Sequence, residues 1–266
     1  MKQPVKPDPP SQPERPQVVE RVASILRAIS TQGAAGARLK DIAVDTGIAR
    51  PSVHRLLSEL AAVAYVTQGA DKRYRLGTAL FSLGLSAPHP IRDLSAIRVL
   101  AQELADHCGD VVYVALRKFD GVHYLLRAEG SYPIRTHLVA VNDSKPFTAS
   151  YSGLALLAQL EESERNSLIN KLVLDAPSDW VEERRHHLER QIRDKIEDVR
   201  NLGYCSGKNI VMPGIAGMAA PIPSATRPPY MSVSISAIEE RLHADRVKEL
   251  APRLLRTARA MSEYIE

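Results

Sequence analysis

The chain has 266 residues, 44% of them hydrophobic and 25% charged, which is ordinary for a globular protein and long enough for two domains. No apolar run approaches the roughly 18 residues that span a membrane, and no signal peptide is visible, so we expect a cytoplasmic protein without a membrane partner. The two cysteines, Cys108 and Cys205, fit neither a metal spacing nor a disulfide spacing and predict reduced thiols.

Residues 1–17 contain six prolines and almost no apolar side chains, so this stretch buries too little surface to offset the entropy of ordering. We therefore expect a disordered tail. From Val18 to Ser30 apolar residues recur at helical spacing, which predicts an amphipathic helix, the first of a small domain over residues 18–77.

Residues 38–76 predict two short helices joined by a tight turn and followed by a hairpin. Gly47 can adopt the positive φ that ends a helix sharply, and Pro51 suits the first turn of the next helix. On one face of that second helix apolar residues recur at helical spacing: Val53, Leu56, Leu57 and Leu60. The hairpin strands, 65–67 and 72–75, would form a wing. This is the layout of a winged helix-turn-helix, whose second helix enters the major groove of DNA.

Polar and basic side chains gather at the exposed start of the second helix and in the wing. They are Arg50, Ser52, His54 and Arg55 in the helix, and Lys72, Arg73 and Arg75 in the wing. We predict base or phosphate contacts for the helix residues and phosphate contacts for the wing. Two alternatives stay open: Arg55 pairs with Glu59 one turn later as an exposed helix charge, and His54 packs against the turn.

The charge distribution supports this prediction. Residues 1–76 carry 12 Lys and Arg against 7 Asp and Glu, whereas residues 77–266 carry 23 against 24. The excess positive charge therefore coincides with the helix-turn-helix pattern, as contact with phosphates requires.

A second domain follows a break in the helical pattern. Pro88 and Pro90 interrupt a pattern that restarts at Thr78, so we place a linker over residues 78–92. Residues 93–266 predict an α+β domain, with a mostly antiparallel sheet flanked by helices. The predicted strands are 111–119, 122–128, 134–141, 216–221 and 231–236, and the predicted helices are 91–107, 151–160, 164–174, 182–202 and 239–265.

In their order and spacing, several segments resemble the IclR family of bacterial transcription regulators. They are VERVASIL from residue 19, GIARPSVHRLLSEL from 47, RYRLG from 73, KPFTASYSGLALLA from 145, NLGYCSGKNIVMPGIAGMAAPI from 201 and SISAIEERL from 234. The resemblance implies a winged helix-turn-helix head, a GAF-like effector-binding domain, and homodimers or homotetramers on palindromic double-stranded DNA operators. It implies a sequence-specific transcriptional regulator controlled by a small organic-acid effector.

The resemblance also implies where the effector binds. The cleft lies between the sheet and the loop before the helix at 151–160, where backbone N–H groups hold the anion. The matching positions are Ser150, Tyr151, Ser152, Ser234 and Ser236. Strand alternation puts Ser234 and Ser236 on one face, which is consistent with that role. Alternatively, these hydroxyls only cap a helix or satisfy backbone groups at an edge.

Three positions depart from the family pattern. Members with a small-acid effector carry an acidic residue where this chain has Gly207, a cysteine where it has Gly217, and a small residue where it has Tyr151. The two glycines remove polar anchors and leave more room. The resemblance therefore predicts that these effector-site positions reshape the pocket for a larger or aromatic acid.

The sequence carries no nucleophile elbow, Walker loop or zincin motif, so we expect no catalysis, no metal and no cofactor. His186-His187 lie in a highly charged predicted helix, where a solvated face is expected rather than a metal site. The alternative from another class is a GAF-like small-molecule sensor whose head binds a protein partner instead of DNA. Arg50 and Arg55 on the exposed helix face argue against it.

Overall fold

The computed structural model describes residues 17–87, 90–119, 121–137, 139–174, 182–208 and 212–266. The chain divides between residues 88 and 89 into two compact units, named here the head and the C-terminal domain. The predicted disordered tail lies, except for residue 17, outside the described residues, and so do residues 88 and 89 of the predicted linker. Among the described helices, none is both long enough and apolar enough to cross a membrane.

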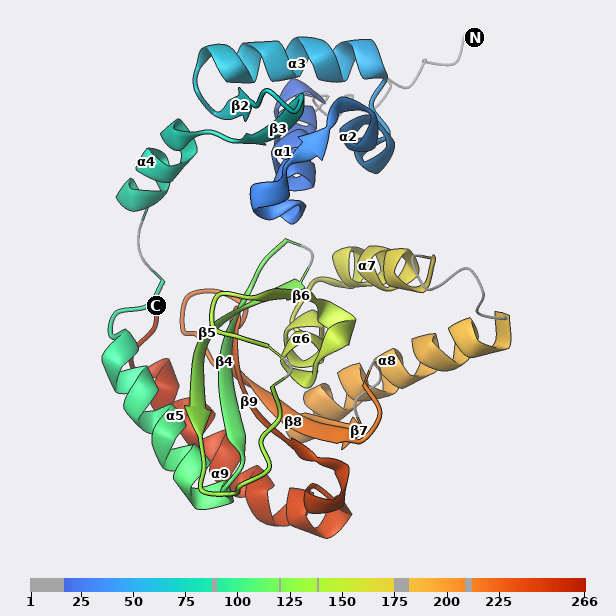
Figure 1. Cartoon of the computed structure of the whole chain (residues 1–266). Coiled ribbons are helices and arrows are strands. Elements are labelled where there is room, and N and C mark those ends of the chain that lie inside the picture. Colours follow the sequence, from blue (N-terminus) through green and yellow to red (C-terminus); the bar gives the residue numbers. More distant parts are fainter. Residues whose placement is uncertain (1–16, 88–89, 120, 138, 175–181, 209–211) are drawn as a thin grey trace, which may run out of the picture. The chain divides into compact units, whose positions relative to one another are not determined.

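Helices and a small antiparallel sheet make up the head (Figure 1). In chain order its elements are α1 (Gln17–Thr31), β1 (Ala37–Arg38), α2 (Leu39–Thr46), α3 (Arg50–Ala62), β2 (Val66–Gln68), β3 (Arg73–Leu76) and α4 (Thr78–Ser86). Strand β3 lies between β1 and β2. The predicted helices and wing are confirmed, whereas the two-residue β1 is too short for the sequence pattern to predict.

The head is held together by a core that the helical spacing predicts. Gly47 ends α2 with φ of 65°, and Pro51 lies in the first turn of α3. Ile25 of α1, Ile42 of α2 and Leu57 of α3 are completely buried in one cluster. Because these apolar faces turn inward, the start of α3 is left at the surface.

The C-terminal domain is built on a six-stranded sheet in the order β6-β5-β4-β9-β8-β7, in which every neighbouring pair is antiparallel. Its elements are α5 (Leu94–Cys108), β4 (Val111–Arg117), β5 (Gly121–Glu129), β6 (Ser144–Pro146), α6 (Tyr151–Leu157), α7 (Glu162–Leu174), α8 (Glu182–Leu202), β7 (Cys205–Lys208), β8 (Ile215–Ile222), β9 (Met231–Ile238) and α9 (Ala244–Ser262). The predicted α+β class is confirmed.

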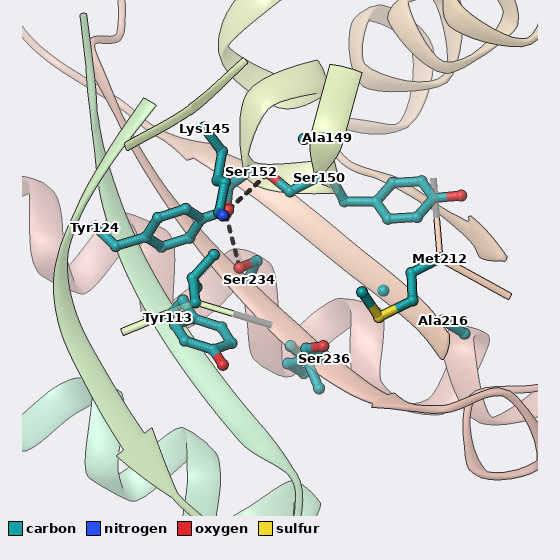
Figure 2. Close-up of a pocket in the computed structure, with 14 residues that line it drawn as sticks. Tyr113, Tyr124, Lys145, Ala149, Ser150, Ser152, Met212, Ala216, Ser234 and Ser236 are labelled. Carbon is teal, nitrogen blue, oxygen red and sulfur yellow. Dashed lines mark hydrogen bonds between the residues drawn. The ribbon is translucent and has the colours of Figure 1, made fainter. Parts of the chain in front are cut away.

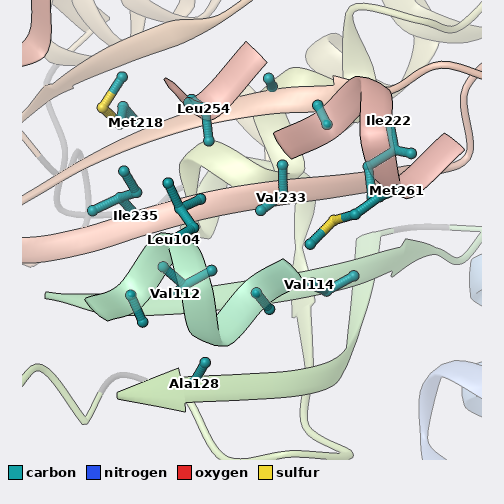
Figure 3. Packing of buried hydrophobic residues seen from close by; sticks show 14 of the residues in the cluster. Leu104, Val112, Val114, Ala128, Met218, Ile222, Val233, Ile235, Leu254 and Met261 are labelled. Atoms are coloured by element: carbon teal, nitrogen blue, oxygen red, sulfur yellow. The ribbon is translucent and has the colours of Figure 1, made fainter. Parts of the chain in front are cut away.

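The two faces of this sheet are covered by different helices (Figure 1). Val112 and Val114 of β4 pack in the cluster with Leu104 of α5 and Leu254 of α9 (Figure 3). The intervening residue Tyr113 belongs to the cluster on the opposite face, which α6 and α8 cover. The alternation of side chains along each strand therefore gives the sheet one face that is apolar along β4, β8 and β9, and a second face that carries polar groups on β4 and β9.

A buried ion pair joins the start of β4 to the segment that leads into α9. The carboxylate of Asp110, whose side chain is 2% exposed, accepts hydrogen bonds of 2.7 and 3.1 Å from the Arg241 guanidinium. A guanidinium nitrogen of Arg246 lies 3.6 Å from the same carboxylate, and the Arg241 guanidinium stacks on the Tyr132 ring at 3.7 Å. Asp110 is thus a buried charge compensated by two cations.

The prediction of a strand over 134–141 is wrong, because its described residues form no strand. The Tyr113 hydroxyl donates to the Thr136 carbonyl, and the Thr136 hydroxyl donates to Ser236, so side chains rather than a backbone ladder hold the segment. The strand that pairs with the start of β5 is instead β6, a few residues later.

The sequence also misplaces two elements near the end of the chain. The helix predicted over 239–265 begins only at Ala244, because a 3-10 turn at Glu239–Arg241 and an extended His243 precede it. Strand β7 is not predicted, since CSGK lacks the β-branched and aromatic residues that mark a strand.

Candidate functional site

An open groove in the head gathers side chains from three segments. The groove is lined by Arg38, Leu39 and Lys40 at the start of α2, by Arg50 and His54 of α3, and by Gln68, Asp71, Lys72 and Tyr74 of the wing. The fold thus brings three of the predicted contact residues, Arg50, His54 and Lys72, to one place. It adds Arg38 and Lys40, at the start of the first helix of the motif, which the sequence pattern does not single out.

The basic side chains in and near this groove differ in whether they already make hydrogen bonds or ion pairs within the head. Within the described part of the chain, the side chains of Arg50 and Lys72 make no hydrogen bond or ion pair. Arg55, by contrast, lies outside the groove and pairs with Glu59 at 3.2 Å, with both side chains more than half exposed. Ser52 is half-buried in the first turn of α3. Arg50 and Lys72 are therefore the cations best placed to meet phosphates or bases.

Two wing arginines bind the head's own backbone. Arg73 donates to the Gly36 carbonyl at 2.9 Å, and Arg75 donates to the Ala34 carbonyl at 2.8 Å. Arg75 also holds Asp71 at 2.7 Å, and this hydrogen bond lowers the pKa of the Asp71 carboxyl well below its ordinary range. These contacts fasten the wing to the turn before β1, so that Arg75 positions the wing.

A cavity of about 130 Å³ opens in the C-terminal domain, on the sheet face that α6 covers (Figure 2). Its described lining residues are Tyr113, Tyr124, Val139, Lys145, Ala149, Ser150, Tyr151, Ser152, Met212, Ala216, Gly217, Ser234, Ile235 and Ser236. They come from β4, β5, β6, α6, β8 and β9 and from the segments that lead into β6, α6 and β8. The volume is close to the roughly 150 Å³ that accommodates a benzene ring in a protein interior.

Hydroxyl groups around this cavity bond to one another in pairs. Ser152 donates to Ser234 at 2.7 Å, Tyr124 donates to Ser150 at 2.7 Å, and Thr136 donates to Ser236 at 3.0 Å. In each pair the accepting hydroxyl keeps its own proton, and that proton has no partner among the described groups. Ser150, Ser234 and Ser236 can therefore each donate a hydrogen bond into the cavity.

Among the described residues that line the cavity, Lys145 is the only one with a positive charge, and none is acidic. Lys145 is half-buried at the edge of the cavity and has no ion-pair partner within the residues that the structure describes. Tyr113 and Tyr124 form an edge-to-face pair with ring centroids 5.4 Å apart. Burial raises the pKa of both phenols, so they are neutral hydrogen-bonding groups and aromatic walls. The lining is suited to an anion that carries an apolar part.

Most of the positions that the resemblance implies do line the cavity, namely Ser150, Tyr151, Ser152, Gly217, Ser234 and Ser236. Gly207 is not among the lining residues; a Cβ atom at this position would lie 2.7 Å from the hydroxyl oxygen of the lining residue Tyr151. Ser150 also caps α6, because its hydroxyl accepts from the Gly153 N–H at 3.2 Å.

The sequence prediction does not include three lining residues that carry hydrogen-bonding or charged groups, namely Tyr113, Tyr124 and Lys145. Tyr113 lies directly opposite Ser234 in the sheet, and Tyr124 lies opposite Ala115, so strand register brings them to the site. Lys145 precedes the predicted helix at 151–160 by only a few residues. As the basic residue of that segment it offered a signal, whereas the tyrosines could be found only once the strand pairing was known.

Comparison with known proteins identifies the family. Residues 89–263 match the family model described as bacterial transcriptional regulator IclR C-terminal, and residues 18–70 match the IclR helix-turn-helix domain. The chain belongs to the IclR family. Its head is a helix-turn-helix DNA-binding domain and its C-terminal domain is an effector-binding domain, so the protein is a transcriptional regulator of IclR type. The alternative, a sensor whose head binds a protein, is not favoured.

Relatives cover nearly the whole chain. The chain is 27% identical over 256 residues to the glycerol operon regulatory protein of Streptomyces coelicolor, covering 91% of this chain and 92% of the relative. It is 24% identical over 226 residues to the acetate operon repressor of Salmonella typhimurium, covering 84% and 81%. The structure of an IclR family transcriptional regulator from Brucella abortus superposes with a TM-score of 0.65 at 21% identity, covering 94% and 93%, and shares the fold.

Proposed function

We propose that this IclR-family regulator binds operator DNA through the groove of its head, and that a small organic acid in the C-terminal cavity changes this binding. The observation that carries the choice of an acid is Lys145, an unpaired cation at the edge of a cavity that has no described acidic lining residue. A carboxylate accepts several hydrogen bonds, and those from a charged donor are the strongest. The spare protons of Ser150, Ser234 and Ser236 supply further donors.

The acid would be bound rather than converted. General acid–base chemistry needs a group that titrates near neutral pH within reach of the ligand. The described lining contains no histidine, aspartate, glutamate or cysteine, and burial raises the pKa of the lining phenols further from neutrality. A binding site that reports the acid to the head accounts for this lining better than an active site does.

In the head, we propose that Arg50, Ser52, His54 and Arg55 contact the major groove and that Lys72 and Arg73 contact phosphates. Two further cations, Arg38 and Lys40, line the same groove and would add phosphate contacts. One recognition helix reads one half-site, so a homodimer or homotetramer on a palindromic operator would supply useful specificity. The acid can shift DNA affinity only through different affinities for two arrangements of the protein.

The test of the acid site compares charged ligands with neutral ligands of the same shape. Calorimetric titrations would use pyruvate, glyoxylate and benzoate, with benzamide as the uncharged match for benzoate. We expect at least one acid to bind and benzamide to bind at least tenfold more weakly than benzoate. Equal affinity for benzoate and benzamide, or no binding by any acid, would contradict the proposal.

The test of the DNA site is a salt titration. Binding to the DNA upstream of the chain's own gene, followed by fluorescence anisotropy, should weaken steeply and linearly on logarithmic scales as salt rises. A specific complex should also survive competition by unrelated DNA. Affinity that does not depend on salt would count against contact between the basic groove and phosphates.

A further inference from the structure

Tyr151 and the two glycines that depart from the family pattern form one packing unit. Gly207 and Gly217 lie directly opposite each other in the β7–β8 pair. A Cβ atom on Gly217 would lie 2.7 Å from the Tyr151 ring carbon Cδ2, and one on Gly207 would lie 2.7 Å from the Tyr151 hydroxyl oxygen. Real Cβ atoms essentially never come that close to another atom. The Tyr151 ring therefore occupies the space that side chains at both positions would need.

Tyr151 makes hydrogen bonds through its ring hydroxyl and through its backbone. Its hydroxyl donates to the Lys208 carbonyl at 2.7 Å, and its backbone carbonyl accepts a weak hydrogen bond from the Cys205 thiol at 3.8 Å. Tyr151 as a whole is 5% exposed. Burial raises the pKa of the phenol, so it is a neutral donor. Because the ring is anchored through its hydroxyl, it cannot rotate away without losing a partly buried hydrogen bond.

The same ring also lines the cavity, so it sets one boundary of the ligand space. The two glycines would leave the cavity larger if position 151 were small, but the Tyr151 ring fills the room that they leave. The cavity that remains has a volume of about 130 Å³, close to that of a cavity that accommodates a single benzene ring.

We propose that Tyr151 is a specificity-determining residue that limits the acid effector to about one ring in size. This inference rests on the proposed function of the cavity as an acid site. It assigns to the Tyr151 ring a steric role toward the ligand, and to Gly207 and Gly217 the role of making room for that ring.

The experiment measures acid binding across a series of increasing size. Pyruvate, benzoate and 2-naphthoate would be titrated by calorimetry into the full-length protein and into Y151A, Y151L and Y151F. Y151F is the matched control, because it keeps the ring and loses only the hydrogen bond to Lys208. Y151L removes less packing than Y151A and serves if Y151A does not melt cooperatively.

We expect the wild type and Y151F to reject 2-naphthoate, and Y151A or Y151L to bind it at least tenfold more tightly than the wild type does. A wild type that binds 2-naphthoate as well as benzoate would overturn the inference, as would an unchanged size limit in folded Y151A and Y151L. If no acid binds to any of the proteins, the proposed function itself fails, which is a different result from binding with an unchanged limit.

A melting experiment tests the packing unit without any ligand. Gly217 has no positive φ, and the next atom that its Cβ would meet, the Ile235 carbonyl oxygen, lies at an ordinary 3.5 Å. Alanine there should therefore be neutral or stabilising unless the ring opposes it. We expect G217A to lower the melting temperature of the wild type, and not to lower that of Y151A further. Equal shifts in both backgrounds would show that Tyr151 and Gly217 do not compete for space.

Discussion

The head and the C-terminal domain present their candidate sites in opposite ways. In the head, the basic side chains lie on the surface, and the core beneath them only fixes the helix that carries them. In the C-terminal domain, the site is a cavity whose serines are themselves part of the packed interior: Ser152, Ser234 and Ser236 are all buried. A surface site can be altered without touching the fold, whereas a cavity site shares its residues with the fold.

The largest effect is expected where the C-terminal domain buries a charge. Replacing Asp110 by Ala leaves Arg241 and Arg246 without their partner and should lower the free energy of unfolding by about 3–5 kcal/mol. The matched change in the head is E59A, which removes an exposed ion pair with Arg55 and should change stability by less than about 0.5 kcal/mol. Urea unfolding measures the free energy of unfolding of both variants. Similar losses in D110A and E59A would contradict the expected difference between the buried and the exposed ion pair.

The next effect concerns the cation of the cavity. Changing Lys145 to Met removes a charged hydrogen-bond donor and should weaken binding of the acid by about 1.5–3 kcal/mol, roughly 10- to 150-fold. DNA binding without acid should stay as in the wild type. K248M, at an exposed lysine of α9, is the control and should bind the acid normally. If K145M binds acids with the affinity of the wild type, Lys145 does not contact the carboxylate of the acid.

A head substitution should change DNA affinity and leave stability alone. R50A should cost about 1–3 kcal/mol of operator binding, with a melting temperature close to that of the wild type, because the exposed Arg50 side chain makes no hydrogen bond or ion pair within the described residues. R75A should lower both quantities, since its guanidinium holds the wing to the Ala34 carbonyl. Anisotropy and thermal melts distinguish the two, and a large stability loss in R50A would contradict the surface description of this site.

The smallest expected effect is a loss of folding stability at alkaline pH, which arises in the C-terminal domain. Burial raises the pKa of the Cys108 thiol to about 11 and raises that of Cys205 as well. An unfolded thiol titrates near 8.5, so the unfolded state loses protons first and stability falls as pH rises from there toward the folded value. From pH 7.5 to 9.5 we expect Cys108 to contribute a loss of about 1.4 kcal/mol. This loss in the free energy of unfolding should be smaller in C108A. If C108A loses as much stability as the wild type over this pH range, groups other than Cys108 cause the loss.

The same contrast explains how much could be predicted from the sequence. The head follows from local signals: Gly47 and Pro51 mark helix ends, and Val53 to Leu60 mark a buried face, so its exposed residues are found by elimination. The cavity depends on strand pairing. Register places Tyr113 opposite Ser234, and no local pattern encodes which strands become neighbours.

The departures at Tyr151, Gly207 and Gly217 illustrate the limit more sharply. Each could be read from the chain one by one, and the two glycines alone predict more room in the pocket. Only the structure shows that the Tyr151 ring takes the space beside both glycines. Steric compensation between residues far apart in sequence is a property of packing, which a single sequence does not display.

We propose that an acid held in the C-terminal cavity controls DNA binding by the head. The most direct test of this proposal is an anisotropy titration of the DNA upstream of the chain's own gene, with and without a saturating acid that calorimetry has shown to bind, on the wild type and on K145M. We expect the acid to change the DNA affinity of the wild type by at least fivefold and to leave that of K145M unchanged at the same concentration. An acid that binds the cavity without changing DNA affinity, or that acts equally on both proteins, would contradict the proposal.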